Sequence, residues 1–269
     1  MGRSARRGAG LREMMVEEGN RLLAALRPAD RETIERRLTP FEFERDHMLH
    51  QAGDIVRYAW FPCDRALASF VVNGEDGTTI ETALVGREGA IGGIVSHGRL
   101  PAFADARVQY AGTFLRIEAA ALEEIKAQSP SVANLFARYS DCLLAQVFQA
   151  VACNAAHNIT QRTAKWLLAA MDRTGDHLIP LRQEQLAELL GVGRSFVNRV
   201  LKGLREDGVL TTRRGYLEIR DFDALNGLAC GCNDRLREHF EVVLAGVYPD
   251  VGDLAIPEDG PVSVTRLAP

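Results

Sequence analysis

Residues 181–208 constrain the fold of this chain more than any other stretch, because they encode two short amphipathic helices on either side of a glycine. In the first helix, Leu186, Ala187 and Leu190 have the spacing of residues that share one face. Gly191 ends this helix, since glycine adopts a left-handed backbone conformation at no steric cost. The pattern predicts a helix-turn-helix, in which the small side chain of Ala187 lets the second helix cross close to the first.

The second helix is predicted to begin near Arg194 and to end by Gly208. At about 100° per residue, its apolar side chains fall in one arc of roughly 140°. They are Phe196, Val197, Val200, Leu201 and Leu204. The opposite arc carries cations, an amide and a hydroxyl, and no carboxylate before Glu206: Arg194, Ser195, Asn198, Arg199, Lys202 and Arg205.

This polar arc has the composition that a helix needs in the major groove of DNA. Arginine and asparagine pair with base edges, whereas lysine and serine reach phosphates. The predicted base-reading residues are Arg194, Ser195, Asn198 and Arg199. A solvated helical hairpin with no such role is the plainer alternative.

Two β-prone runs follow in residues 209–219 and flank Arg213, Arg214 and Gly215, which predicts a hairpin with arginines at its tip. The predicted phosphate contacts are Gln183, Lys202, Arg213 and Arg214. Helix-turn-helix and hairpin together resemble the winged DNA-binding domain of the Crp/Fnr superfamily of bacterial transcription regulators. The resemblance is carried by Gln-Glu-Gln-Leu-Ala at residues 183–187, Leu-Gly-Val at 190–192, Arg194, Val197, Arg-Val-Leu at 199–201 and Leu-Arg-Glu-Asp-Gly at 204–208.

The resemblance implies a cytoplasmic homodimer that binds a palindromic operator on double-stranded DNA and contacts RNA polymerase. Arg194 and Arg199 match the family's guanine-contacting arginines, but Ser195 replaces a common glutamate. The chain has 269 residues, of which 46% are hydrophobic and 25% charged, and a formal charge of −4. An acidic total does not exclude DNA binding, because the binding patch is local. No apolar run approaches the roughly 20 residues that cross a bilayer, so no membrane association is expected.

Residues 39–119 alternate short β-prone runs with turns, which predicts an all-β sandwich or roll. The resemblance extends here to the family's cyclic-nucleotide-binding-like sensor, through Phe-Glu-Phe at residues 41–43, Gly-Asp at 53–54, Tyr-Ala-Trp-Phe-Pro at 58–62 and Val-Gly-Arg-Glu-Gly at 85–89. The complete fold expected is α+β: an amino-terminal β-roll (a double-stranded β-helix), a long dimerisation helix and a carboxy-terminal winged helix-turn-helix.

The sensor departs from members that bind cyclic nucleotides. Ala90 stands in place of the glutamate that binds ribose, and Ala104 in place of the arginine that binds the cyclic phosphate. Asp105 would repel a phosphate, and a buried anion without its cation is unfavourable by several kcal/mol. Cyclic AMP is therefore not expected as effector. Arg87, Gly89 and Gly92 are candidates for binding some other anion, with ordinary turn glycines as the alternative.

Residues 130–157 predict a long helix whose apolar face is too broad for one neighbour. In the family this helix forms the dimer seam, and the candidates here are Leu144, Val147, Phe148 and Val151. The expected organisation is a disordered basic arm (1–12), lead-in helices and β-roll (13–129), the dimerisation helix (130–157), the winged domain (158–228), and a carboxy-terminal helix with a flexible tail (229–269).

Five cysteines, an odd number, fit a reducing compartment. Cys230 and Cys232 are weak metal candidates, because zinc normally takes four ligands and no second pair is evident in the sequence. His47, His50 and His97 are weaker candidates still. No cofactor and no catalytic site is expected. The alternative functions are a small-molecule or redox sensor that acts through a protein partner, and an enzyme with a metal site in the β-roll, for which a convincing ligand set is missing.

Overall fold

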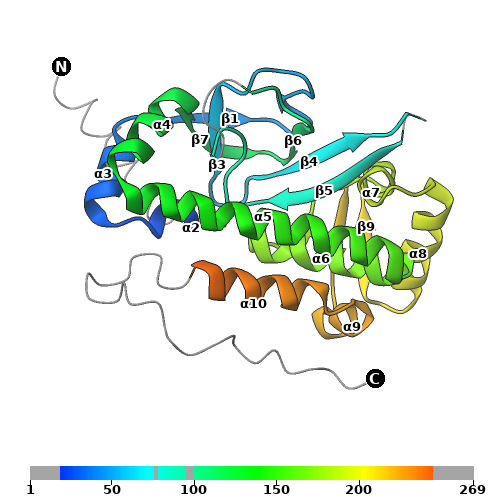
Figure 1. Ribbon diagram of the computed structural model, residues 1–269. Coiled ribbons are helices and arrows are strands. Elements are labelled where there is room, and N and C mark those ends of the chain that lie inside the picture. Colours follow the sequence, from blue (N-terminus) through cyan, green and yellow to red (C-terminus); the bar gives the residue numbers. More distant parts are fainter. Residues whose placement is uncertain (1–18, 76–77, 95–99, 245–269) are drawn as a thin grey trace, which may run out of the picture.

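The structure is a computed structural model that describes residues 19–75, 78–94 and 100–244. Within them, a β-roll and a winged helix-turn-helix are joined by one long helix (Figure 1). The predicted α+β architecture is confirmed. The predicted basic arm, the tail from residue 248 and His97 lie outside the described residues.

The β-roll consists of two antiparallel sheets. One has the order β1-β7-β3, formed by β1 (Thr39–Phe43), β7 (Gly112–Glu118) and β3 (Tyr58–Pro62). The other has the order β2-β6-β4-β5, formed by β2 (Met48–His50), β6 (Asp105–Tyr110), β4 (Leu67–Asn73) and β5 (Thr79–Val85). Trp60, Val108 and Phe114 fill the space between them, as the alternating strand pattern requires.

Short helices bracket the roll: α2 (Arg21–Ala24) and α3 (Pro28–Glu35) precede it, and α4 (Ala119–Gln128) follows it. The long helix α5 (Pro130–Ala156) has 27 residues and is capped by the Ser129 side chain, which accepts a hydrogen bond from the Val132 amide. Its first half packs on the roll through Leu135, Phe136 and Tyr139. These contacts hold the β-roll on the same helix that leads to the winged domain.

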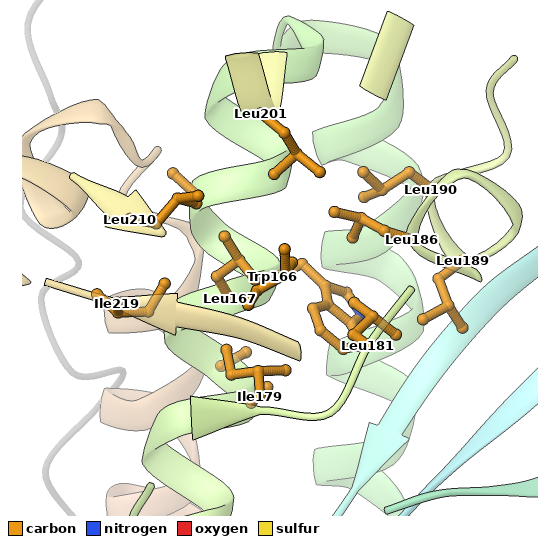
Figure 2. Packing of buried hydrophobic residues seen from close by; sticks show 14 of the residues in the cluster. Trp166, Leu167, Ile179, Leu181, Leu186, Leu189, Leu190, Leu201, Leu210 and Ile219 are labelled. Atoms are coloured by element: carbon orange, nitrogen blue, oxygen red, sulfur yellow. The ribbon is translucent and has the colours of Figure 1, made fainter. Parts of the chain in front are cut away.

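The helical conformation is interrupted between α5 and α6 (Ile159–Thr174). His157 is the C-cap of α5, and Asn158 caps α6 through a reciprocal pair of hydrogen bonds with Gln161. The winged domain then consists of α6, β8 (Leu178–Ile179), α7 (Gln183–Leu190), α8 (Arg194–Glu206), β9 (Leu210–Arg213), β10 (Tyr216–Ile219) and α9 (Phe222–Leu228). Figure 2 shows its core, where Trp166 and Leu167 of α6 meet Leu186, Leu201 and Leu210.

The last described helix, α10 (Cys232–Leu244), lies alongside α5 and α6 (Figure 1). Phe240, Val243 and Leu244 pack against the core that α5 shares with the β-roll, and Arg138 of α5 donates a hydrogen bond to the Val243 carbonyl at 3.1 Å. In this way α10 covers a second side of α5. Of the helices described, none combines the length and the apolar character needed to cross a bilayer.

Candidate nucleic-acid interface

The turn between α7 and α8 is fixed by Gly191, which adopts φ 61° and ψ 41° as the C-cap of α7. The Val192 amide donates a hydrogen bond to the Ala187 carbonyl at 3.0 Å, which closes the turn. A Cβ atom at position 191 would also come within 3.0 Å of Ile80 in β5. The left-handed backbone therefore favours glycine here, and the Ile80 side chain leaves little room for a larger residue.

Helix α8 buries one face and exposes the other. Val197, Leu201 and Leu204 are fully buried in the domain core. Arg194, Ser195, Asn198 and Arg199 are all exposed, so the structure brings the four base-reading candidates onto one accessible strip of the helix. Positions i, i+1, i+4 and i+5 of a helix share a face, which accounts for this grouping.

Phe196 corrects the sequence prediction. It was placed in the apolar arc of α8, but 52% of it is exposed. Phe196 lies at one edge of the arc, and Leu201, at the other edge, is fully buried, so the buried face of α8 is shifted toward Leu201. The Arg199 guanidinium carbon lies 5.8 Å from the centroid of the Phe196 ring, so the aromatic side chain borders the exposed strip.

The residues predicted to contact phosphates differ in their exposure and in whether they form ion pairs within the protein. Arg213 Nε lies 3.0 Å from an oxygen of Glu218, a buried carboxylate that also pairs with Arg220 at 3.1 Å. Lys202 Nζ lies 3.7 Å from Glu206 on the exposed face of α8. Arg214 is exposed at the hairpin tip beside Gly215, whose φ of 82° forms the turn. Gln183 is half-buried at the start of α7.

The predicted dimer residues lie along the middle and end of α5. Leu144, Phe148 and Val151 are exposed large hydrophobic side chains, at 49%, 64% and 66%, whereas Val147 is half-buried. Neither the β-roll nor α10 covers the exposed three. Their spacing of four and three residues is that of an apolar seam between two helices.

The winged domain contacts the β-roll as well as α5. Trp166 Nε1 donates a hydrogen bond to Glu81 Oε1 in β5 at 2.8 Å. Gln185 Nε2 in α7 donates to Asp46 Oδ1 at 3.2 Å. Burial raises the pKa of Glu81 to about 7, although the hydrogen bond from Trp166 and the nearby Lys165 and Arg173 oppose this shift.

The candidate effector residues are held by close packing. A Cβ atom on Gly89 would overlap the Tyr139 hydroxyl, and one on Gly92 would lie 2.6 Å from the Tyr58 carbonyl oxygen. The Arg87 carbonyl accepts a hydrogen bond from the Arg21 amide at 2.6 Å. Packing thus accounts for both glycines, and an anion site formed by these residues stays a prediction.

A set of residues that the sequence analysis did not assemble lies at the break after α5. Cys230 and Cys232 meet Cys153 and His157 there, and one potential ligand atom from each lies within 4.8 Å of the others. No second pair is evident in the sequence beside Cys230 and Cys232, and the structure brings Cys153 and His157 to them. The signal that could have found it is the spacing of Cys153 and His157, which places them one turn apart on a helix.

Residues 161–228 match the family model described as the Crp-like helix-turn-helix domain. No curated protein sequence matches the chain significantly. Residues 161–228 thus form a Crp-like helix-turn-helix domain.

Solved structures match over most of the chain. One is FixK2 from Bradyrhizobium japonicum, with a TM-score of 0.61 and 18% identity over 72% of this chain and 98% of that one. Another, at 0.60 and 15% over 72% and 100%, is described as the c-di-GMP responsive global regulator CLP of Xanthomonas campestris. A third is a CRP-family transcriptional regulator from Thermus thermophilus, at 0.60 and 19% over 70% and 95%. These similarities show a shared fold.

Proposed function

We propose that this chain, which joins a Crp-like helix-turn-helix domain to the fold of the Crp/Fnr transcription regulators, binds a palindromic operator as a homodimer and regulates transcription there. RNA polymerase is the expected protein partner at the promoter. Cyclic AMP is not its effector in this proposal.

The observation that carries the proposal is the exposed strip on α8. Four side chains suited to base edges, Arg194, Ser195, Asn198 and Arg199, lie together on the face opposite the domain core. Exposed Phe196 extends the strip with an apolar group of the kind that contacts thymine methyls. Lys202 and Arg214 supply charge at its flank and at the wing tip, where phosphates would lie.

The exposed side of α5 supports the homodimer. Leu144, Phe148 and Val151 form a row of apolar groups that a second copy of the same helix would bury. A two-fold pair of recognition helices reads two half-sites about one turn of DNA apart, roughly 34 Å. Pairing through this face of α5 would therefore give the two-fold arrangement that a palindromic operator requires.

The β-roll supports the exclusion of cyclic AMP. Ala90 is buried and offers no carboxylate to a ribose, and Ala104 offers no cation to a phosphate. The Asp105 carboxylate accepts hydrogen bonds from the Ala52 amide at 2.7 Å and from Asn73 Nδ2 at 2.8 Å. An anion placed beside it would meet a like charge that is already fixed in place.

Selection of bound sequences from a random DNA pool tests the proposal, and we expect a split palindrome. Arg199→Ala should then cost about 1–3 kcal/mol at one base pair of each half-site and relax the preference there. Arg214→Ala should weaken every sequence alike, since a phosphate contact carries no base information. Equal losses on all sequences for Arg199→Ala, at fixed salt, would contradict the assignment of Arg199 as a base-reading residue.

A further inference from the structure

Four potential metal ligands converge where the long helix meets the winged domain. Cys153 lies in the last turn of α5 and His157 is its C-cap. Cys230 lies in the link after α9, and Cys232 is the first residue of α10. Two segments that are distant in sequence, one at the end of α5 and one before and at the start of α10, thus place three sulfur atoms and an imidazole nitrogen within 4.8 Å of one another.

We propose that Cys153, His157, Cys230 and Cys232 bind one zinc ion in a closed tetrahedral site. Cys153 Sγ lies 3.7 Å from Cys230 Sγ, and Cys232 Sγ lies 3.6 Å from His157 Nδ1. A tetrahedron with Zn–S bonds of about 2.3 Å and Zn–N bonds of about 2.0 Å has edges of about 3.8 Å between sulfurs and about 3.5 Å between sulfur and nitrogen. The two observed separations match these edges.

The spacing also argues against two other uses of these cysteines. In an iron–sulfur cluster the four ligands are divided among two or more irons, so they do not all lie as close to one another as the four ligands of a single metal ion. A disulfide between Cys153 and Cys230 would need its sulfurs at about 2.05 Å and would leave Cys232 and His157 without a role. Three thiols and an imidazole are, in contrast, a complete ligand set for a structural zinc ion.

The surroundings suit a closed site. Cys153, Cys230 and Cys232 are 1%, 8% and 3% exposed, so water has little access. Gln149 Nε2 donates a hydrogen bond to Cys232 Sγ at 3.1 Å, which is the kind of outer contact that orients and stabilises a metal-bound thiolate.

The charge of the site is offset by α6. Three thiolates and Zn²⁺ carry a net charge of −1, and this would be unfavourable in a buried position without a cation nearby. The positive charge of Lys165 in α6 acts on Cys153 and favours its thiolate. Arg162, whose guanidinium also interacts with Cys153, stands one turn earlier on the same helix.

The position of the site gives it a structural role. His157 is the break between α5 and α6, and Cys230 and Cys232 follow the end of the winged domain. A metal ion held by all four therefore ties both ends of the winged domain to the long helix. The metal ion would fix the orientation of the winged domain, and therefore of α8, relative to the long helix.

Metal analysis of the full chain, purified in a reducing buffer, tests the site. We expect about one zinc ion per chain, as a single tetrahedral site requires. Replacement of zinc by Co²⁺ should produce thiolate-to-cobalt charge-transfer absorption and the intense visible bands of a tetrahedral ion. Cys232→Ser should lose the metal, and Cys142→Ala, which removes a buried thiol elsewhere on α5, should retain it.

Gln149→Ala gives a graded test, because loss of an outer-shell contact lowers metal affinity by about 10–100-fold. The cobalt spectrum of the unmodified chain tests for a tetrahedral thiolate site even if the cysteine variants do not fold. A chain that retains no metal and stays spectroscopically silent with Co²⁺ would overturn the proposal. Several irons with sulfide per chain, or full zinc content in folded Cys232→Ser, would overturn it equally.

Discussion

Glu81 is a carboxyl group at the contact between the β-roll and the winged domain. It accepts the Trp166 Nε1 hydrogen bond at 2.8 Å, and burial raises its pKa from the ordinary 4.5 to about 7. Lys165, Arg173 and a hydrogen bond from Ser69 act in the opposite direction but do not cancel the burial. Near neutral pH this inter-domain contact is therefore close to its point of half-protonation.

We expect the stability of the folded chain to fall as pH rises from about 4.5 to about 7, through the contribution of Glu81. In this window the folded state holds a proton that the unfolded state has released, so raising the pH favours unfolding. Glu81→Gln should remove this part of the slope. Unfolding midpoints measured from about pH 5 to about pH 8 check it, with exposed Glu184→Gln as control. The same slope in Glu81→Gln and the unmodified chain would refute the assignment.

Several residues have surroundings that the sequence alone does not predict. The helical angle of Phe196 places it at one edge of the apolar arc, and the angle alone does not predict that this edge is exposed while Leu201, at the other edge, is buried. The position of Arg213 at a hairpin tip predicts a phosphate contact, but the sequence does not predict its ion pair with Glu218 on the neighbouring strand β10. Cys153 and His157 meet Cys230 only because the chain returns to the end of α5. The cysteine contacts join residues that are distant in sequence, and the Arg213–Glu218 pair depends on how the two strands of one hairpin are placed.

At the scale of elements, local sequence patterns predict most helices and strands of the structure. The helix-turn-helix, the wing and the β-roll follow from periodicity and turn residues, which act over a few positions. The packing of α10 did not follow, because its partners on α5 and α6 lie many residues earlier. An amphipathic pattern predicts that a helix has a buried face, but the pattern does not identify the surface that buries it.

The exposed seam on α5 leads to a prediction about assembly. Phe148→Glu should convert the dimer to a monomer, because each Phe148 buried in a dimer contributes about 1.5–3 kcal/mol and the substitution removes two of them. The dimer dissociation constant should rise at least about 100-fold. Sedimentation measures this, and Val242→Glu, on an exposed apolar residue of α10, is the matched control. A dimer of unchanged affinity in Phe148→Glu would place the interface elsewhere.

At the scale of the whole molecule, charge is unevenly distributed. The chain has a formal charge of −4, yet α8 carries Arg194, Arg199, Lys202 and Arg205 on its exposed face and Arg214 stands at the wing tip. A DNA-binding surface can be strongly cationic on an acidic molecule, because screening limits each charge to about 10 Å at moderate salt. Net charge therefore says little about the partner, and the local strip says more.

The dependence of binding on salt separates a DNA partner from a protein partner. Each phosphate contact releases counterions, so the logarithm of the binding constant should fall linearly with that of the salt concentration, by about 0.9 per contact. Arg214→Gln removes one contact from each protomer and should reduce the slope by about 1.8. Arg36→Gln at the C-cap of α3, at the end of the molecule away from α8 (Figure 1), removes the same charge and should leave the slope unchanged. Binding to DNA that does not vary with salt, or equal slopes for the two variants, would contradict a phosphate contact at the wing tip.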